Sequence, residues 1–143
     1  LSLKKLELKN DKIEDYYELS HSLGIVPKNF NKLQNKLFGI ECNYEELNGI
    51  DFQKGCYVGQ ENTARIKLKN KLSKRLFPIN IIYGKLHEGE SIYNNEIEIG
   101  KVLIDNDYPF ALVKYLDKNF DEKFDFNTKD AQIIIKKPNW IKI

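Results

Sequence analysis

The residues best suited to chemistry form one short segment, Lys54-Gly55-Cys56-Tyr57-Val58-Gly59-Gln60-Glu61. A thiol reacts as its thiolate, and nearby cations or the N–H groups at the start of a helix favour that form. Lys54 and Arg65 lie close to Cys56 in the sequence, and residues 59–64 are expected to open a short helix. We therefore take Cys56 as the candidate reactive group and the two cations as the support for its thiolate.

The residues around Cys56 are of types that favour a loop with a defined conformation. Gly55 and Gly59 permit backbone conformations that other residues resist, so a ligand or partner can approach the backbone closely. Gln60 and Glu61 are expected to orient the loop through hydrogen bonds, and Tyr57 to provide either a packing anchor or a stacking surface. From the residues alone, a buried cysteine in a glycine turn is the competing interpretation.

The remaining cysteine and the two histidines predict no second reactive centre. Cys42 and Cys56 lack the spacing of a redox or zinc motif, although a disulfide between them stays open. A four-ligand zinc site is not expected, because His21 and His87 are the only histidines. Neither histidine stands in a cysteine-protease motif, and His87 is expected in a surface turn. We predict no metal site and no hydrolytic activity.

The whole eight-residue segment resembles the signature K-G-C-[FY]-x-G-Q-E of the YgfZ/GcvT-like family. The resemblance extends over roughly residues 21–116, and it is specific between Lys54 and Arg65. Weaker matches flank the segment: Gly24-Ile25-Val26-Pro27, Phe38-Gly39-Ile40-Glu41 with Asn43, Ala64-Arg65, Lys74-Arg75-Leu76, Gly100, and Phe110-Ala111-Leu112.

The resemblance implies a folate-binding protein that acts in the synthesis or repair of iron–sulfur clusters. Its implied ligand is tetrahydrofolate, and its implied partners are iron–sulfur client or assembly proteins. Cys56 would act as a transient persulfide, a cluster contact or a redox-exchange thiol, and the sequence does not choose among these roles. Two alternatives stay open, namely a tetrahydrofolate-dependent aminomethyltransferase similar to the glycine cleavage T-protein, and a non-catalytic interaction module.

The resemblance also implies the domain organisation. Residues 1–69 would be the C-terminal part of a GcvT-like folate-binding domain that carries the signature, and residues 70–143 a small antiparallel β-barrel. The predicted class is therefore α+β. Family members are longer and this chain contains no methionine, so we expect a C-terminal fragment with an incomplete folate pocket.

Hydrophobic periodicity predicts the elements that must position the signature. Residues 11–23 have helical spacing that Pro27 terminates, Asn29 is expected to cap a second helix that ends before Gly39, and residues 45–47 are expected to form a helical turn. After the signature the spacing alternates, which is typical of strands. We expect strands at 66–69, 77–83, 91–93, 97–99, 102–104, 110–116 and 132–136, with Phe77, Ile79, Ile81 and Tyr83 on one face. Periodicity alone fits a sandwich or a barrel.

Composition bounds the remaining possibilities. A hydrophobic content of 41% and a net charge of +2 in 143 residues indicate a folded chain. Seven cations against one acid between Lys54 and Arg75 form a basic stretch that suits a polyanion such as a polyglutamylated folate tail, or a solvated strand face. Motifs of RNA-binding domains are missing, so direct nucleic-acid binding is not expected. No run of apolar residues is long enough to span a membrane. The default location is then the cytoplasm or an organelle matrix, and we predict the cytoplasm.

Overall fold

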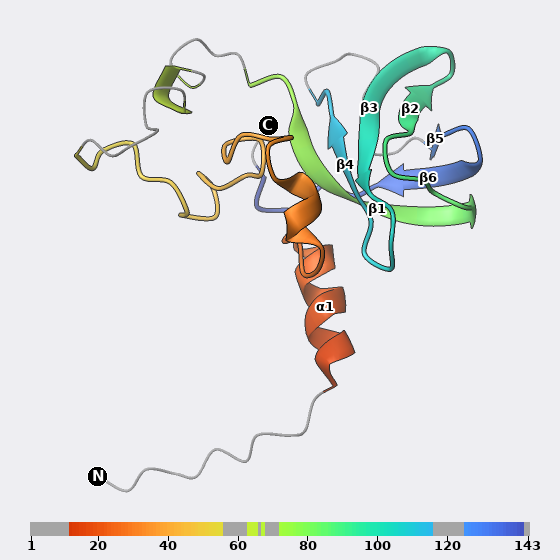
Figure 1. Ribbon diagram of the computed structural model, residues 1–143, viewed down its shortest axis with the longest axis horizontal. Helices are drawn as coiled ribbons and strands as arrows, with labels where there is room; N and C mark the ends of the chain where they lie inside the picture. The colour runs from red at the N-terminus through yellow and green to blue at the C-terminus, as the bar shows by residue number, and fades with distance from the viewer. Residues whose placement is uncertain (1–11, 56–62, 66, 68–71, 116–124, 142–143) are drawn as a thin grey trace, which may run out of the picture.

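The computed structural model describes residues 12–55, 63–65, 67, 72–115 and 125–141. Within this part of the chain, six antiparallel strands close into a barrel, preceded by the α-helix α1 and the short 3-10 helix η1, and residues 63–65 and 67 also have helical backbone (Figure 1). The predicted α+β class with a small antiparallel barrel is confirmed. The elements are α1 (Ile13–Ser22), η1 (Phe30–Leu33), β1 (Arg75–Gly84), β2 (Ser91–Asn94), β3 (Ile97–Ile104), β4 (Phe110–Val113), β5 (Asp125–Asn127) and β6 (Ala131–Ile135).

The long strand β1 closes the barrel because it divides its pairing between two partners. Its first residues, Arg75 to Pro78, pair with β4, and its later residues, Ile79 to Gly84, pair with β6. The resulting strand order is β1-β4-β3-β2-β5-β6, which leaves none of these strands as an unpaired edge. A domain boundary at residue 70 stays a prediction, since residues 68–71 lie outside the described part of the chain.

Inward-facing apolar side chains from all six strands fill the barrel. Phe77 and Phe126 are the largest of them, and both are fully buried. Burial of one large apolar side chain contributes roughly 1.5 to 3 kcal/mol, so these two rings are major contributors to barrel stability. The rest of this core consists of Ile79, Leu86, Ile92, Ile99, Val102, Ala111, Val113, Ala131, Ile133, Ile135 and Ile141.

A second apolar cluster lies on the outside of the barrel, where the N-terminal segment covers it. Leu33 and Cys42 pack there against Leu76 of β1 and against residues of β3 and β4. The first five residues of β1 are consequently buried on both faces, while the last five, 80–84, are exposed. The segment from η1 to residue 44 therefore acts as a cover for one side of the barrel.

The predicted single apolar face of residues 77–83 is wrong in its second half. Phe77 and Ile79 point into the core, but Ile81 and Tyr83 are 43% and 63% exposed. The register of β1 against β6 shifts between Ile81 and Tyr83, so a bulge interrupts the inward and outward alternation before Tyr83. Ile81 still pairs in register with Ile133 and is exposed because it lies in the exposed second half of β1.

Helix α1 packs against the loop between β3 and β4. The His21 ring meets the Phe110 ring edge to face at 5.1 Å, and its Nε2 lies 2.9 Å from the carbonyl oxygen of Pro109. At the end of the helix, Trp140 donates a hydrogen bond of 2.9 Å from Nε1 to the Leu23 carbonyl. Gly24, at a φ of 73°, terminates the helix three residues before Pro27, the residue expected to end it.

Three other sequence expectations need correction. Asn29 has a φ of 60° and no capping hydrogen bond, and only the 3-10 turn η1 follows it in place of a helix. Residues 97–104 form one strand, where two strands at 97–99 and 102–104 were expected. Gly100 lies inside this strand, at a point where a Cβ would come within 2.7 Å of the Leu112 carbonyl oxygen. Lys67 has helical backbone, where a strand was expected over 66–69. Strand β5, of only three residues, was not expected at all.

Gly84 and Gly89 provide a test of barrel closure because their φ angles are 88° and 89°. A Cβ at residue 84 would lie 2.1 Å from the Asp130 carbonyl oxygen, whereas a Cβ at residue 89 would lie no closer than 3.8 Å to the Lys101 side chain. We expect Gly89→Ala to cost about 1 to 2 kcal/mol for the backbone conformation alone. Gly84→Ala should cost at least about 2 kcal/mol more, because the hairpin must also move. Urea unfolding measures both, and equal costs would contradict the close approach of β1 to β6.

His21 predicts a pH dependence of stability. Burial lowers the pKa of its imidazole, and the hydrogen bond to Pro109 opposes that effect in part. The unfolded chain therefore takes up the proton first as the pH falls, so stability present above the unfolded pKa is lost as the pH falls through the folded pKa. Urea unfolding followed by the fluorescence of Trp140 should show lower stability at about pH 5.5 than at about pH 7.5. His21→Asn should reduce this difference, and an unchanged difference in that variant would assign the effect to other groups.

Candidate functional site

Most of the predicted cysteine segment lies outside the described residues: Cys56, Tyr57, Gly59, Gln60 and Glu61. The three site residues that the structure describes, Lys54, Gly55 and Arg65, are exposed to solvent. A Cβ built on Gly55 would meet no atom within 4 Å, so steric crowding among the described atoms does not require glycine there. The role of Cys56 and the support of its thiolate by the two cations stay predictions.

Lys67 brings the two sides of the cysteine segment together. Its ammonium group pairs with the Glu45 carboxylate and lies 4.1 Å from the centroid of the Phe52 ring. Glu45 and Phe52 precede Cys56 in the chain, and Lys67 follows it. Each of these exposed contacts contributes no more than about 1 kcal/mol. Together they hold described residues that precede and follow the segment near each other, through a lysine that sequence analysis had assigned to a strand.

A buried polar junction joins the N-terminal segment to the barrel. Asn43 is fully buried at a φ of 62°. Its Nδ2 donates to the carbonyl of Leu76 at 2.9 Å, and its Oδ1 accepts from Nη1 of Arg75 at 2.9 Å. Arg75 is itself 7% exposed and pairs with Glu46 at 2.5 Å. Two motif fragments that were noted separately in the sequence, one containing Asn43 and the other Arg75-Leu76, are thus direct neighbours in space.

The junction extends to the chain that follows β4. The Arg75 guanidinium lies 5.3 Å from the centroid of the Tyr115 ring, and the Tyr115 hydroxyl donates to the carbonyl of Leu72 at 3.0 Å. Within the described residues, Oε2 of Glu46 and Nε of Arg75 are buried and have no hydrogen-bond partner. Buried water molecules usually satisfy such atoms by hydrogen bonding to them. The junction therefore offers one acceptor and one donor to a buried water molecule.

The environment of Cys42 makes it a poor nucleophile. Its side chain is 8% exposed and lies in the apolar cluster outside the barrel. Burial, with a smaller contribution from the charge of Glu41, raises the pKa of the Cys42 thiol to about 11. The fraction of thiolate at neutral pH is then roughly a hundredfold below that of an ordinary cysteine. Cys42 is a free thiol in the structure, so the disulfide to Cys56 that the sequence left open is not formed here.

The basic stretch between Lys54 and Arg75 is less of a surface patch than its composition suggested. Arg75 is buried and neutralised by Glu46, and Lys67 pairs with Glu45. Both acids precede residue 54, so counting charge between residues 54 and 75 could not include them. The charge of Arg75 is therefore held inside the fold, and that of Lys67 is partly offset by Glu45 at the surface.

Comparison with known proteins identifies relatives of this chain. No protein-family model matches it. It is 37% identical over 78 residues to the mitochondrial iron–sulfur cluster assembly factor IBA57 homolog of Dictyostelium discoideum, covering 54% of this chain. It is 33% identical over 100 residues to the homolog of Neurospora crassa and 38% identical over 69 residues to IBA57 of Homo sapiens, covering 61% and 48% of this chain.

Over about half of its length the chain is thus similar to proteins of the YgfZ/GcvT-like family. The resemblance predicted from the cysteine segment and its flanking motifs is thereby confirmed. The matched regions span only 18%, 23% and 19% of the Dictyostelium, Neurospora and human proteins, so this chain corresponds to a minor part of each relative.

The predicted cytoplasmic location is wrong. The relatives are named as mitochondrial proteins, which contradicts it. The prediction rested on the lack of a long apolar segment, and that property is shared by proteins of the cytoplasm and of an organelle matrix. In the described part of the chain, no helix combines the length and the apolar character needed to cross a membrane.

The difference between the two cysteines is directly testable by alkylation. At neutral pH we expect iodoacetamide to modify Cys56 readily in the folded chain and Cys42 at least about a hundredfold more slowly, because the Cys42 thiol is protonated and buried. Mass spectrometry of the two cysteine peptides measures both rates. In urea the rates should converge, which serves as the control. Equal rates in the folded chain would contradict the burial of Cys42.

Proposed function

We propose that this chain is part of a folate-binding, YgfZ-like protein that supports the assembly or repair of iron–sulfur cluster enzymes. The observation that carries the proposal is its similarity to the IBA57 iron–sulfur cluster assembly factors of three distant organisms. Because the chain spans less than a quarter of each relative, the activity belongs to the longer protein, to which this part contributes a barrel and a cysteine segment.

Cys56 is the thiol that we assign to this function. The alternative thiol, Cys42, is buried, and its raised pKa keeps it protonated at neutral pH. The cysteine segment begins at exposed residues and is bracketed by the contacts of Lys67 with Glu45 and Phe52. An exchange thiol must be reached by a second protein, and the exposure of Lys54 and Gly55, the last described residues before Cys56, suits that requirement. Figure 1 shows the chain up to residue 55 extending away from the barrel.

The supporting residues are proposed to act on the thiol and its loop. Lys54 and Arg65 stabilise the thiolate by their charge, and Gln60 and Glu61 orient the loop through hydrogen bonds. The relatives' names support partners among the proteins of iron–sulfur cluster assembly and a mitochondrial site of action. Tetrahydrofolate is the proposed ligand of the longer protein, and this chain alone is expected to hold only part of its pocket.

Replacement of the thiol tests the proposal. In the full-length protein, we expect Cys56→Ala to fail to restore a cluster-dependent enzyme activity in a strain that lacks the endogenous copy. The matched control is Cys42→Ala, which removes a buried thiol, costs about 1 kcal/mol of stability and should restore activity. Immunoblots must show equal protein levels for both variants.

Two results would contradict the proposal. Full rescue by Cys56→Ala would remove the thiol from the mechanism while leaving the assembly role intact. Turnover of the purified full-length protein in an aminomethyl-transfer assay with tetrahydrofolate and a lipoyl carrier would replace the assembly role by that of a transferase.

A further inference from the structure

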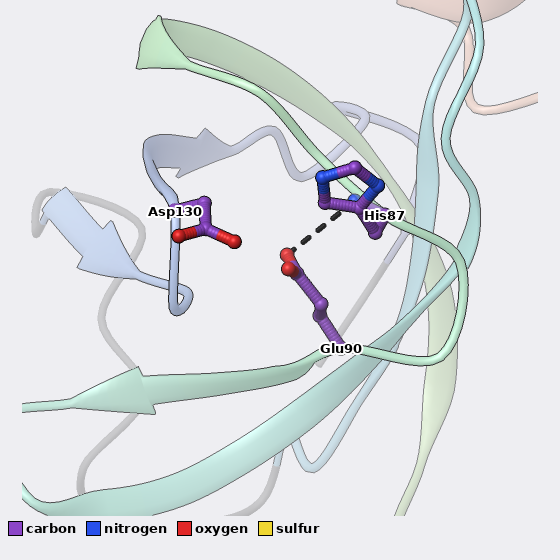
Figure 2. A group of neighbouring side chains, drawn as sticks. All are labelled: His87, Glu90 and Asp130. Carbon is purple, nitrogen blue, oxygen red and sulfur yellow. Dashed lines mark hydrogen bonds between the residues drawn. The ribbon is translucent and has the colours of Figure 1, made fainter.

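Three side chains with metal-binding atoms converge beyond the end of β1. His87 and Glu90 come from the turn between β1 and β2, and Asp130 from the hairpin between β5 and β6. One potential ligand atom from each lies within 4.8 Å of the other two. Figure 2 shows the imidazole ring and the two carboxylates around one open space. His87 and Asp130 are exposed and Glu90 is half-buried, so an ion from solvent can reach all three.

The turn that carries two of these residues is fixed to the barrel. Leu86 is buried in the core and anchors the start of the turn. The Gly89 N–H donates to the Val102 carbonyl at 2.8 Å, and the Val102 N–H donates to the Glu90 carbonyl at 2.8 Å. His87 therefore lies between two anchored points, and Glu90 has its backbone tied to β3.

Asp130 is fixed from the other side. Its carbonyl accepts a hydrogen bond from the N–H of Lys85 at 3.2 Å. The hairpin around it is closed by Thr128, whose N–H donates to the Ala131 carbonyl at 2.8 Å and whose Oγ1 accepts from the Ala131 N–H at 3.1 Å. Gly84 permits this approach, since any side chain there would meet the Asp130 backbone. The barrel thus sets the distance between the two loops, and only side-chain rotation remains to bring the ligands together.

The donor set selects a class of ion. One imidazole nitrogen with two carboxylate groups suits divalent first-row metals such as Mn²⁺, Fe²⁺, Co²⁺ and Zn²⁺, whereas Mg²⁺ and Ca²⁺ prefer oxygen ligands alone. Bond lengths of about 2.0 to 2.2 Å place ligand atoms roughly 3 to 3.5 Å apart, so rotations that shift each terminal atom by about an ångström would close the site. Without a cation, two carboxylates held this close repel each other.

We propose that His87, Glu90 and Asp130 bind one divalent first-row transition-metal ion, which joins the β1–β2 turn to the β5–β6 hairpin. The site lies away from the Asn43–Arg75 junction. It follows Gly84 at the end of β1, while the Asn43–Arg75 junction lies at the start of that ten-residue strand, a path of up to about 30 Å. The role of the ion is therefore to stabilise the barrel by linking two loops far apart in the sequence.

Cobalt and zinc titrations test the proposal on the whole chain carrying Cys56→Ala, so that this thiol does not compete for the metal. We expect Co²⁺ to bind with one-to-one stoichiometry, to give a visible d–d absorption band without a thiolate charge-transfer band, and to be displaced by Zn²⁺. Zn²⁺ should also raise the Tm, because it binds only the folded arrangement of the two loops.

Variants of the ligands decide whether these three residues form the site. Asp130→Asn and His87→Asn should each weaken Co²⁺ binding at least about tenfold. If circular dichroism shows that either variant is unfolded, Glu90→Gln takes its place. The matched control is Glu98→Gln, which removes an exposed carboxylate of β3 outside the cluster and should leave binding unchanged. No saturable binding up to about 1 mM Co²⁺, or binding that the three ligand variants do not weaken, would overturn the proposal.

Discussion

The fully buried side chain of Asn43 fixes where the N-terminal segment meets the barrel. Its amide donates to the backbone of β1 at Leu76 and accepts from the guanidinium of Arg75. Loss of one partner from a buried ionic pair costs several kcal/mol, because the remaining charge is left without compensation. Arg75 can be buried because Asn43 and Glu46 surround its charge, and this burial brings β1 to the segment that covers the barrel. The same constraint explains the left-handed backbone of Asn43, a residue type that tolerates it better than most.

That junction also explains how β1 contributes to both the barrel interior and the apolar cluster outside the barrel. The first half of β1 contributes Phe77 and Ile79 to the interior and Leu76 to the outer cluster with Leu33 and Cys42. Its second half has no cover and is exposed on the outside. The chain segment that leads to Cys56 therefore follows residues that are packed and hydrogen-bonded against the barrel. Lys67, which comes after Cys56 in the sequence, contacts Glu45 and Phe52 of that segment.

Local patterns in the sequence predicted much of the fold, and long-range contacts account for the rest. Helix α1 and the strands around Phe77, Ser91 and Phe110 follow from periodicity, because half-buried elements repeat their apolar residues at a fixed spacing. Closure into a barrel depends on which strands pair, and only the family resemblance indicated it. Strand β5 is too short to show a period, and Gly100 looked like a break because its close approach to Leu112 is invisible in one dimension. The convergence of His87 with Asp130 depends on pairing between β1 and β6, so spacing could not reveal it.

The two cysteines illustrate how environment and not residue type decides chemical role. The sequence motif singled out Cys56 as the candidate reactive thiol and gave Cys42 no reactive role. Burial in the outer cluster raises the pKa of Cys42 to about 11, so its thiol is a packing group whose neutral form the fold itself stabilises. Such a group contributes stability below the pKa of the unfolded thiol and loses it as the pH rises through the folded value. The cover segment that protects Cys42 precedes Cys56 in the chain, so the packing that makes one thiol inert also anchors the part of the chain that leads to the thiol proposed to react.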